Sequence, residues 1–290
     1  MAHETRYPRP DQPTLDALVT TALADFGTPP HEPEWVEHGS NTLVALTDRV
    51  AVRIARQRQA GGEVLRSQRL VDALPDLPFD VPRSLAAPVE IDGHVAVATR
   101  RLLGSPQPTT RPDAGALREV LDAVHGVDAP ALEPHLAPRR AFCGGEDWEA
   151  TLRDRVVPLL AADLHDEALR RIDALAAVEQ APRTVNHGDL GSSNVLWHGD
   201  RVGALLDWDL TALEDPAEDV ATAATSFGLW PSVEHLATIA IARRARAFAG
   251  TFPLQIVAFS VRNRRPTDEL RRTLARAHRA LQKPALTGGA

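Results

Sequence analysis

Hydrophobic and polar positions in the first hundred residues alternate between helical and strand-like spacing. Apolar residues recur every three or four positions in two segments and every second position elsewhere, with short polar turns between the strand-like runs. The pattern predicts a helix over 14–26, three strands joined by turns over 34–56, a helix over 61–74 and a hairpin over 82–102. This part of the chain should therefore fold as a small antiparallel sheet with helices.

Beyond the Gly/Pro-rich segment 102–108, nearly all of the chain has helical spacing. Such a segment is a natural boundary, so we predict an N-terminal lobe over residues 1–102 and a C-terminal lobe over residues 103–290. The expected helices are 113–127, 146–161, 163–179, 215–227, 232–250 and 266–282, with a Pro-rich loop over 128–140 and short strands within 183–209. The predicted class is α+β, with a small antiparallel-sheet lobe and a larger, mainly helical lobe.

Composition and charge narrow the functional classes. The 290 residues are 43% apolar, which is enough to bury a core in two lobes or in one large domain. Cys143 is the only cysteine, so the chain suits a reducing compartment, and no run approaches the roughly 18 apolar residues of a membrane span. The net charge of −7 disfavours a nucleic-acid partner and mildly favours a cationic small molecule. We therefore expect a cytoplasmic protein, monomer or homodimer, that binds neither nucleic acid nor membrane.

The segment 185–209, VNHGDLGSSNVLWHGDRVGALLDWD, gathers polar side chains between short apolar runs. Asp189 and Asn194 flank a loop without strong preference for helix or strand, and Asp207 ends the next strand. If the strands pair as a hairpin, Asn194 and Asp207 come close together. Two carboxylates and an amide oxygen form an all-oxygen donor set, which suits Mg²⁺ rather than zinc and leaves room for substrate phosphates. The cluster therefore indicates metal-assisted phosphate chemistry.

A zinc site is the alternative interpretation of the same segment. Its ligands would be His187, His198, Asp189 and Asp207, and the repeated HGD triplet gives the idea some support. The second triplet, at 198–200, falls where the hairpin turn is expected, and Gly-Asp is typical of turns. We therefore prefer the magnesium interpretation.

Three motifs in this region resemble those of the aminoglycoside phosphotransferase family, which is related to choline kinases and distantly to protein kinases. They are HGDLGSSN at 187–194, LLDWD at 205–209 and EDPAEDVA at 214–221. The family pattern is H-x-D-x-x-x-x-N, then an acidic doublet, then D-P-x-x-D, and all three occur here in order. The resemblance implies a bilobal protein-kinase-like fold and transfer of the γ-phosphate of ATP or GTP to a hydroxyl.

The resemblance also implies roles for individual residues. Asp189 would be the catalytic carboxylate that orients the acceptor hydroxyl and takes its proton. Asn194 and Asp207 would hold Mg²⁺ against the nucleotide phosphates. Asp209 would either assist at the metal or support the site from outside it.

Two further residues are expected to hold the catalytic loop in place rather than to react. His187 would brace the loop through its ring nitrogens. Asp219, in the D-P-x-x-D motif, would tie the loop to the following helix by accepting backbone hydrogen bonds.

The N-terminal lobe should bind the nucleotide largely through its backbone. The turn around Ser40 and Asn41 sits where the family has its phosphate-covering turn, although an ordinary hairpin turn explains the sequence almost as well. The backbone of 99–102, which includes Arg100 and Leu102, is expected to form the hinge that hydrogen-bonds the base.

A basic side chain should also reach the α- and β-phosphates from the third strand, where kinase-like folds carry a lysine. The only lysine is Lys283, so an arginine must serve, and we choose Arg53, with Arg56 as the rival. Its expected carboxylate partner on the next helix is Glu63.

The acceptor is less defined than the chemistry. The family includes kinases of aminoglycosides, macrolides, peptide antibiotics, choline, sugars and homoserine, and the loop motif is most similar to kinases of viomycin-type peptides. A group of acidic residues could line a site for a cationic acceptor, or could simply be a solvated helix start: Glu146, Asp147, Glu149 and Asp154. The loop 128–145 is a plausible acceptor lid, and Trp148, Trp208 and Trp230 are expected in the core.

Three functional hypotheses therefore remain. The first is an NTP-dependent O-phosphotransferase acting on a small molecule, either an antibiotic or a metabolite such as choline, a sugar or homoserine. The second is a catalytically silent kinase-like binding protein, which the intact Asp189, Asn194 and Asp207 disfavour. The third is a metal-dependent phosphohydrolase, which would release phosphate without an acceptor.

Overall fold

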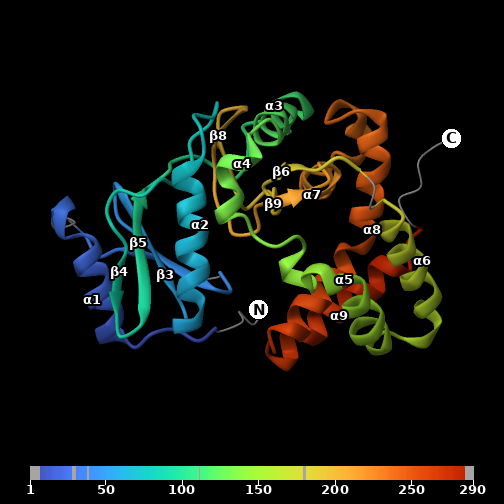
Figure 1. Ribbon diagram of the computed structural model, residues 1–290, viewed down its shortest axis with the longest axis horizontal. Helices are drawn as coiled ribbons and strands as arrows, with labels where there is room; N and C mark the ends of the chain where they lie inside the picture. Colours follow the sequence, from blue (N-terminus) through green and yellow to red (C-terminus); the bar gives the residue numbers. More distant parts are fainter. Residues whose placement is uncertain (1–6, 28–30, 38, 111, 179–180, 285–290) are drawn as a thin grey trace.

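A five-stranded antiparallel sheet forms one end of the molecule (Figure 1). The computed structural model describes residues 7–27, 31–37, 39–110, 112–178 and 181–284. The strand order is β1-β2-β3-β5-β4. The strands are β1 (Glu34–Val36), β2 (Thr42–Leu46), β3 (Val50–Ala55), β4 (Val89–Ile91) and β5 (His94–Arg100). The predicted hairpin of β4 and β5 turns at Asp92 and Gly93, both with positive φ, and Asp-Gly is a typical sequence for such a turn.

The side chains of the central strand β3 point alternately to its two faces, and the two faces have different roles. Val50, Val52 and Ile54 are buried in a small core with α1 (Gln12–Ala22). Arg53 points to the opposite face, which α2 (Gly61–Ala73) covers. The sheet therefore presents one basic side chain towards the rest of the molecule.

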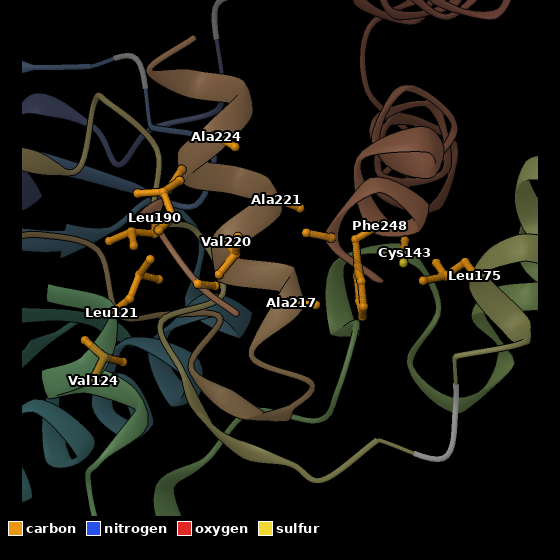
Figure 2. Packing of buried hydrophobic residues seen from close by; sticks show 14 of the residues in the cluster. Leu121, Val124, Cys143, Leu175, Leu190, Ala217, Val220, Ala221, Ala224 and Phe248 are labelled. Atoms are coloured by element: carbon orange, nitrogen blue, oxygen red, sulfur yellow. The ribbon is translucent and has the colours of Figure 1, made fainter. Parts of the chain in front are cut away.

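Helices make up most of the other lobe. They are α3 (Ala114–His125), α4 (Ala129–Leu132), α5 (Trp148–Thr151), α6 (His165–Ala176), α7 (Ala217–Ser226), α8 (Ile239–Arg262) and α9 (Thr267–Leu281). Figure 2 shows α7 at the centre, with Val220 directed towards α3 and Ala221 towards Phe248 of α8. The buried alanines of α7 let these neighbours approach closely.

Three expected elements differ from the prediction. In place of the helix expected over 232–250, a 3₁₀ turn spans Trp230–His235 and α8 runs from Ile239 to Arg262. The helix expected over 146–161 is broken: α5 has four residues, and a π-helical turn (Leu152–Val156) and a 3₁₀ turn (Val157–Leu159) follow it. Pro158 lacks the N–H that a continuous helix needs there. The loop expected over 128–140 instead contains α4 and the 3₁₀ turn Glu133–His135.

Two small two-stranded sheets lie between the helices. One pairs β7 (Val195–His198) with β8 (Arg201–Leu205), and this is the predicted hairpin. The other pairs β6 (Thr184–Asn186) with β9 (Ala212–Glu214), a strand that the sequence pattern did not reveal.

The β7–β8 hairpin is also bonded to the chain that leads into and out of the large sheet. Asp80 exchanges backbone hydrogen bonds of 2.8 and 3.0 Å with Gly203 and Leu205, and Ser105 exchanges two with Trp197. The hairpin is therefore fixed where the two lobes meet. The lobe boundary at residue 102 stays a prediction. Within the described ranges, no helix is both long and apolar enough to cross a membrane.

Candidate active site

The loop between β6 and β7 is braced by His187. Its side chain is fully buried, and Nδ1 accepts a hydrogen bond of 3.2 Å from the Asp189 amide. Nε2 therefore carries the proton and donates to the Leu206 carbonyl at 3.0 Å. Burial lowers the pKa of His187, which keeps the ring neutral, and the ring packs against Trp208 at 4.7 Å. The predicted bracing role is confirmed.

Asp219 holds the same loop from the first turn of α7. Its fully buried carboxylate accepts hydrogen bonds from the amides of His187 (2.8 Å) and Gly188 (2.9 Å) and from His125 Nε2 (3.2 Å). Burial alone would raise the pKa of Asp219, but the hydrogen bond and charge of His125, with His187 and Gly188, lower it. The predicted tie between loop and helix is confirmed.

The catalytic candidate Asp189 is oriented by Asn194. The Asn194 amide nitrogen donates at 2.9 Å both to the Asp189 carbonyl and to its Oδ2. These bonds fix the orientation of the amide, so that Asn194 Oδ1 remains as an acceptor with only a 3.5 Å contact from Ser193 Oγ. Burial and the nearby Asp207 raise the pKa of Asp189, although His187 and Asn194 oppose them. A raised pKa suits a group that must take a proton.

The hairpin brings Asp207 next to these residues. Leu206 donates its amide to the Asn194 carbonyl at 2.8 Å, so the predicted proximity of Asn194 and Asp207 is confirmed. Trp208 is buried in the core, whereas the Asp207 side chain is half-exposed. Asp207 has a φ of 58°, which is uncommon for a residue with a side chain and is often found at functional sites.

Arg53 reaches this acidic doublet from β3. It forms an ion pair with Asp209 Oδ2, lies 4.0 Å from Asp207 Oδ1 and donates to Ser67 Oγ at 3.1 Å. Burial would raise the pKa of Asp209, but the charge and hydrogen bond of Arg53 lower it. Among the positions considered, Arg53 is the basic side chain that faces the site.

The expected pair between Arg53 and Glu63 does not form, and that prediction is wrong. Glu63 is mostly exposed and pairs with Arg66 at 3.0 Å. Ser67 lies one helical turn further along α2, is fully buried, and occupies the position level with Arg53. Sequence reasoning missed Ser67 because a serine at helical spacing gives no charge signal.

The rival residue, Arg56, has a structural role in the turn before β2. It is buried and donates from Nε to the carbonyls of Gly39 (2.7 Å) and Thr42 (3.1 Å) and from a terminal nitrogen to that of Glu37. The turn passes so close to itself that a Cβ on Gly39 would lie 2.7 Å from the Thr42 oxygen. Arg56 thereby fixes the turn that carries Ser40 and Asn41.

The predicted hinge lies at the end of β5. Arg100 is exposed and pairs with Asp80 at 2.7 Å, and the Arg101 amide donates to the Arg49 carbonyl at 2.9 Å. No backbone hydrogen bond among the described residues involves Leu102. Its N–H and C=O are therefore available to a nucleobase, and the hinge role stays a prediction.

The zinc interpretation does not fit the histidines. Both ring nitrogens of His187 are hydrogen-bonded, and His198 donates from Nε2 to the Leu103 carbonyl at 2.9 Å, beside the hairpin turn. In the part of the chain that the structure describes, no three or more His, Cys, Asp or Glu side chains are arranged to hold a metal.

The oxygen donors near Arg53 do fit magnesium. Asp209 Oδ1 is buried without a hydrogen-bond partner, and Asn194 Oδ1 is turned away from Asp189. Asp207 adds a half-exposed carboxylate. Magnesium commonly takes one or two carboxylates and completes its shell with water and phosphate oxygens. A set of this size therefore suits a metal that arrives with the nucleotide.

A cavity of about 780 Å³ opens beside these residues. One wall carries Ser40 and Asn41 from the N-terminal turn, and Asp189 and Asp207 lie on another. The remaining wall combines α7 and α8 with Phe142 from the loop 128–145. The volume suits a drug-sized molecule.

The acidic residues expected to line the acceptor site lie elsewhere. Glu146 and Glu149 face a separate cavity of about 280 Å³, next to Arg139 and Arg140, and neither Asp147 nor Asp154 lines the larger cavity. None of these four residues therefore lines the cavity beside Asp189. Of the three tryptophans, Trp148 and Trp208 are buried in the core and Trp230 packs against it, as expected.

Comparison with known proteins gives the family. The sequence model of the phosphotransferase enzyme family (APH) matches residues 36–253. The chain is 28% identical over 249 residues to viomycin phosphotransferase of Streptomyces vinaceus, covering 79% of this chain and 87% of that protein. It is 31% identical over 171 residues to homoserine kinase of Methylobacterium sp. (strain 4-46), covering 50% and 51%.

Solved structures agree on the fold. The GDP complex of aminoglycoside 2'-phosphotransferase-IIIa superposes with a TM-score of 0.77 at 15% identity, covering 94% of this chain and 99% of that one. Macrolide 2'-phosphotransferase MphH of Brachybacterium faecium gives 0.67 at 20% identity, covering 93% and 98%. The predicted α+β kinase-like class is confirmed, and the chain belongs to the phosphotransferase enzyme family.

Proposed function

We propose that this protein is an NTP-dependent O-phosphotransferase that moves the γ-phosphate of ATP or GTP to a hydroxyl of a small-molecule antibiotic in the cytoplasm. One observation carries the proposal: Asp189, Asn194 and Asp207 converge with Arg53 beside a cavity large enough for a drug-sized acceptor. The similarity to viomycin phosphotransferase makes peptide antibiotics of that type the first class to test. Neighbouring structures with bound GDP and ADP support a nucleotide donor.

Each residue then has a defined task. Asp189 orients the acceptor hydroxyl and takes its proton, and Asn194 holds the Asp189 carboxylate in place. Asn194 Oδ1 and Asp207 are the side chains that would hold Mg²⁺, which neutralises phosphate charge when it is bound. When the nucleotide binds, Arg53 gives up its ion pair with Asp209 and binds the phosphates instead.

The remaining nucleotide contacts come from backbone. The amides of Ser40 and Asn41, held by the Arg56 clamp, cover the phosphates from the N-terminal turn. The free N–H and C=O of Leu102, next to Arg100, receive the base. Glu63 takes no part in this arrangement, because it pairs with Arg66 at the surface.

Phosphorylation of a small metabolite is the second candidate, because half of the chain is 31% identical to a homoserine kinase. The same residues would do the same chemistry on a different alcohol. The acceptor screen below separates the two.

The test compares the protein with its Asp189→Asn variant. Purified protein, Mg²⁺ and ATP or GTP are incubated with aminoglycosides, macrolides, viomycin-type peptides, choline, sugars and homoserine. We expect one class to stimulate release of nucleoside diphosphate and to gain a phosphate by mass. Asp189→Asn should lower kcat by at least about 10³-fold and leave the nucleotide Kd within roughly threefold. Phosphate release without any acceptor would overturn the proposal in favour of a phosphohydrolase, and nucleotide binding without turnover in favour of a silent binding protein.

A further inference from the structure

One face of each of two neighbouring helices forms the acceptor side of the 780 Å³ cavity. The α7 residues are Glu218, Thr222, Thr225 and Ser226, and the α8 residues are Phe252, Gln255, Ile256 and Phe259. Both sets follow helical spacing, and α7 and α8 pack directly against each other. The α8 face is apolar apart from Gln255, and Phe142 extends the apolar surface.

Glu218 is the one acidic residue of this wall, and its carboxyl group has no partner. The side chain is 5% exposed and lines the cavity, and no hydrogen bond to its carboxyl group is found within the described residues. Burial, together with Glu214 and Asp219, raises the pKa of Glu218 to about 8, although Arg140 and Arg139 oppose the shift. Cys143 is a further titratable neighbour, and burial raises the pKa of its thiol to about 12. The carboxyl oxygens of Glu218 are not among the fully enclosed unpaired atoms, so they face the cavity, where a ligand can reach them.

Gln255 offers a second acceptor without a donor. Its amide nitrogen donates to Thr251 Oγ1 at 2.8 Å, and the Thr251 hydroxyl in turn donates to the Phe248 carbonyl at 2.9 Å. This chain of bonds fixes the orientation of the amide, so the buried Oε1 is left without a hydrogen-bond partner. The wall thus contains two groups that can accept N–H bonds from a ligand: the Gln255 amide oxygen and, once it has lost its proton, the Glu218 carboxylate.

We propose that Glu218 and Gln255 form a subsite for one ammonium or guanidinium group of the acceptor, whose remaining body is apolar. This inference rests on the proposed function, because it assigns the acceptor side of the same cavity. A cationic group with several N–H donors satisfies both acceptors at once. The rest of this wall includes Phe142, Phe252 and Phe259 and contains no second carboxylate that could bind another cation.

A basic residue of the cavity lining also disfavours a polycation. Arg276 of α9 lines the cavity and is exposed. Glu146 and Glu149, which could attract further cations, face another cavity. Asp189, Asp207 and Asp209 also line the cavity, but they are assigned to catalysis and to the metal. The acceptor wall therefore favours an amphipathic alcohol with a single cation near its apolar body over a compound with many amino groups.

Binding of small probes tests the subsite without turnover. Phenethylammonium, 2-phenylethanol and spermine are titrated by NMR into the full-length protein and into Glu218→Gln, with Asp154→Asn as a matched surface control. We expect phenethylammonium to bind the wild type and Asp154→Asn roughly tenfold or more tighter than 2-phenylethanol, and to lose that preference in Glu218→Gln. Its affinity should rise as the pH rises through about 8 in the wild type, because Glu218 then loses its proton, and should stay flat in the variant.

Two results would overturn the subsite. One is equal affinity of phenethylammonium for wild type and Glu218→Gln, and the other is tighter binding of spermine than of phenethylammonium. For an acceptor found in the screen, Glu218→Gln should raise the acceptor KM roughly 10- to 100-fold and leave the nucleotide KM unchanged. When the amino group of the acceptor is acetylated, the acceptor KM should be the same for the variant and the wild type. Failure of every acceptor in the screen removes the proposed function, whereas the probe titrations judge the subsite separately.

Discussion

Replacing Asp219 by asparagine keeps the size of the side chain but removes its charge and one of its two acceptor oxygens. In the wild type, one oxygen accepts the Gly188 amide at 2.9 Å, and the other accepts the His187 amide at 2.8 Å and His125 Nε2 at 3.2 Å. All three donors meet a carboxylate with no solvent exposure. The new amide nitrogen must face at least one of them, so one buried donor loses its acceptor.

The cost follows from these contacts. A buried donor left without an acceptor costs about 1–3 kcal/mol, and the surviving bonds lose their charge assistance. We therefore expect Asp219→Asn to lower the free energy of unfolding by about 2–4 kcal/mol, a large share of the roughly 5–15 kcal/mol of a typical domain. Because His187 and Gly188 lead directly to Asp189, kcat should fall as well.

Urea unfolding at pH 7 measures the change, with Asp166→Asn, an exposed carboxylate at the start of α6, as the control. The control should stay within about 0.5 kcal/mol of the wild type. The pKa of Asp219 is lower in the folded state, so its contribution should be fully present above pH about 4 and disappear as the pH falls below that. Equal unfolding midpoints for Asp219→Asn and Asp166→Asn would refute this account of how the loop is held.

Three further substitutions test other parts of the site. Gly188 has a φ of +82° and an added Cβ would overlap the Leu210 carbonyl, so Gly188→Ala should cost at least about 2 kcal/mol in urea unfolding. Arg53→Lys keeps the charge but cannot also hold Ser67, so the KM for ATP should rise several-fold to about tenfold in steady-state kinetics. Glu218 holds its proton up to pH about 8 when folded, so wild-type stability falls as the pH rises from about 4.3 to 8. Glu218→Gln should therefore be more stable than the wild type at pH 9, by on the order of 1–3 kcal/mol, with a smaller gain at pH 5.

The predictions that held depend on short-range patterns. The Gly-Asp signal at 199–200 marks the turn of the β7–β8 hairpin, and pairing of its strands necessarily brings Asn194 towards Asp207. The D-W-D doublet likewise follows from local chemistry: Trp208 is the side chain that belongs in the core, so its two acidic neighbours remain outside.

The predictions that failed depend on how distant elements align. Glu63 and Ser67 lie one turn apart on the same face of α2, so helical periodicity does not tell which of them lies level with Arg53. The actual partner, Asp209, is 156 positions away in the sequence. Only the docking of the two lobes decides this contact, and no local pattern contains that information.

Glu218 and Asp219 show how burial changes the meaning of a motif. Both belong to D-P-x-x-D, and in the sequence Glu218 resembles an ordinary solvated acid at a helix start. Successive helical positions differ by about 100° in direction, so Asp219 turns under the catalytic loop while Glu218 turns into the cavity wall. Asp215 accepts the Ala217 amide at 3.0 Å and so fixes the start of this helix. A single turn of α7 therefore positions both the loop that carries Asp189 and the acceptor wall opposite it, and a shift of that turn would move both together.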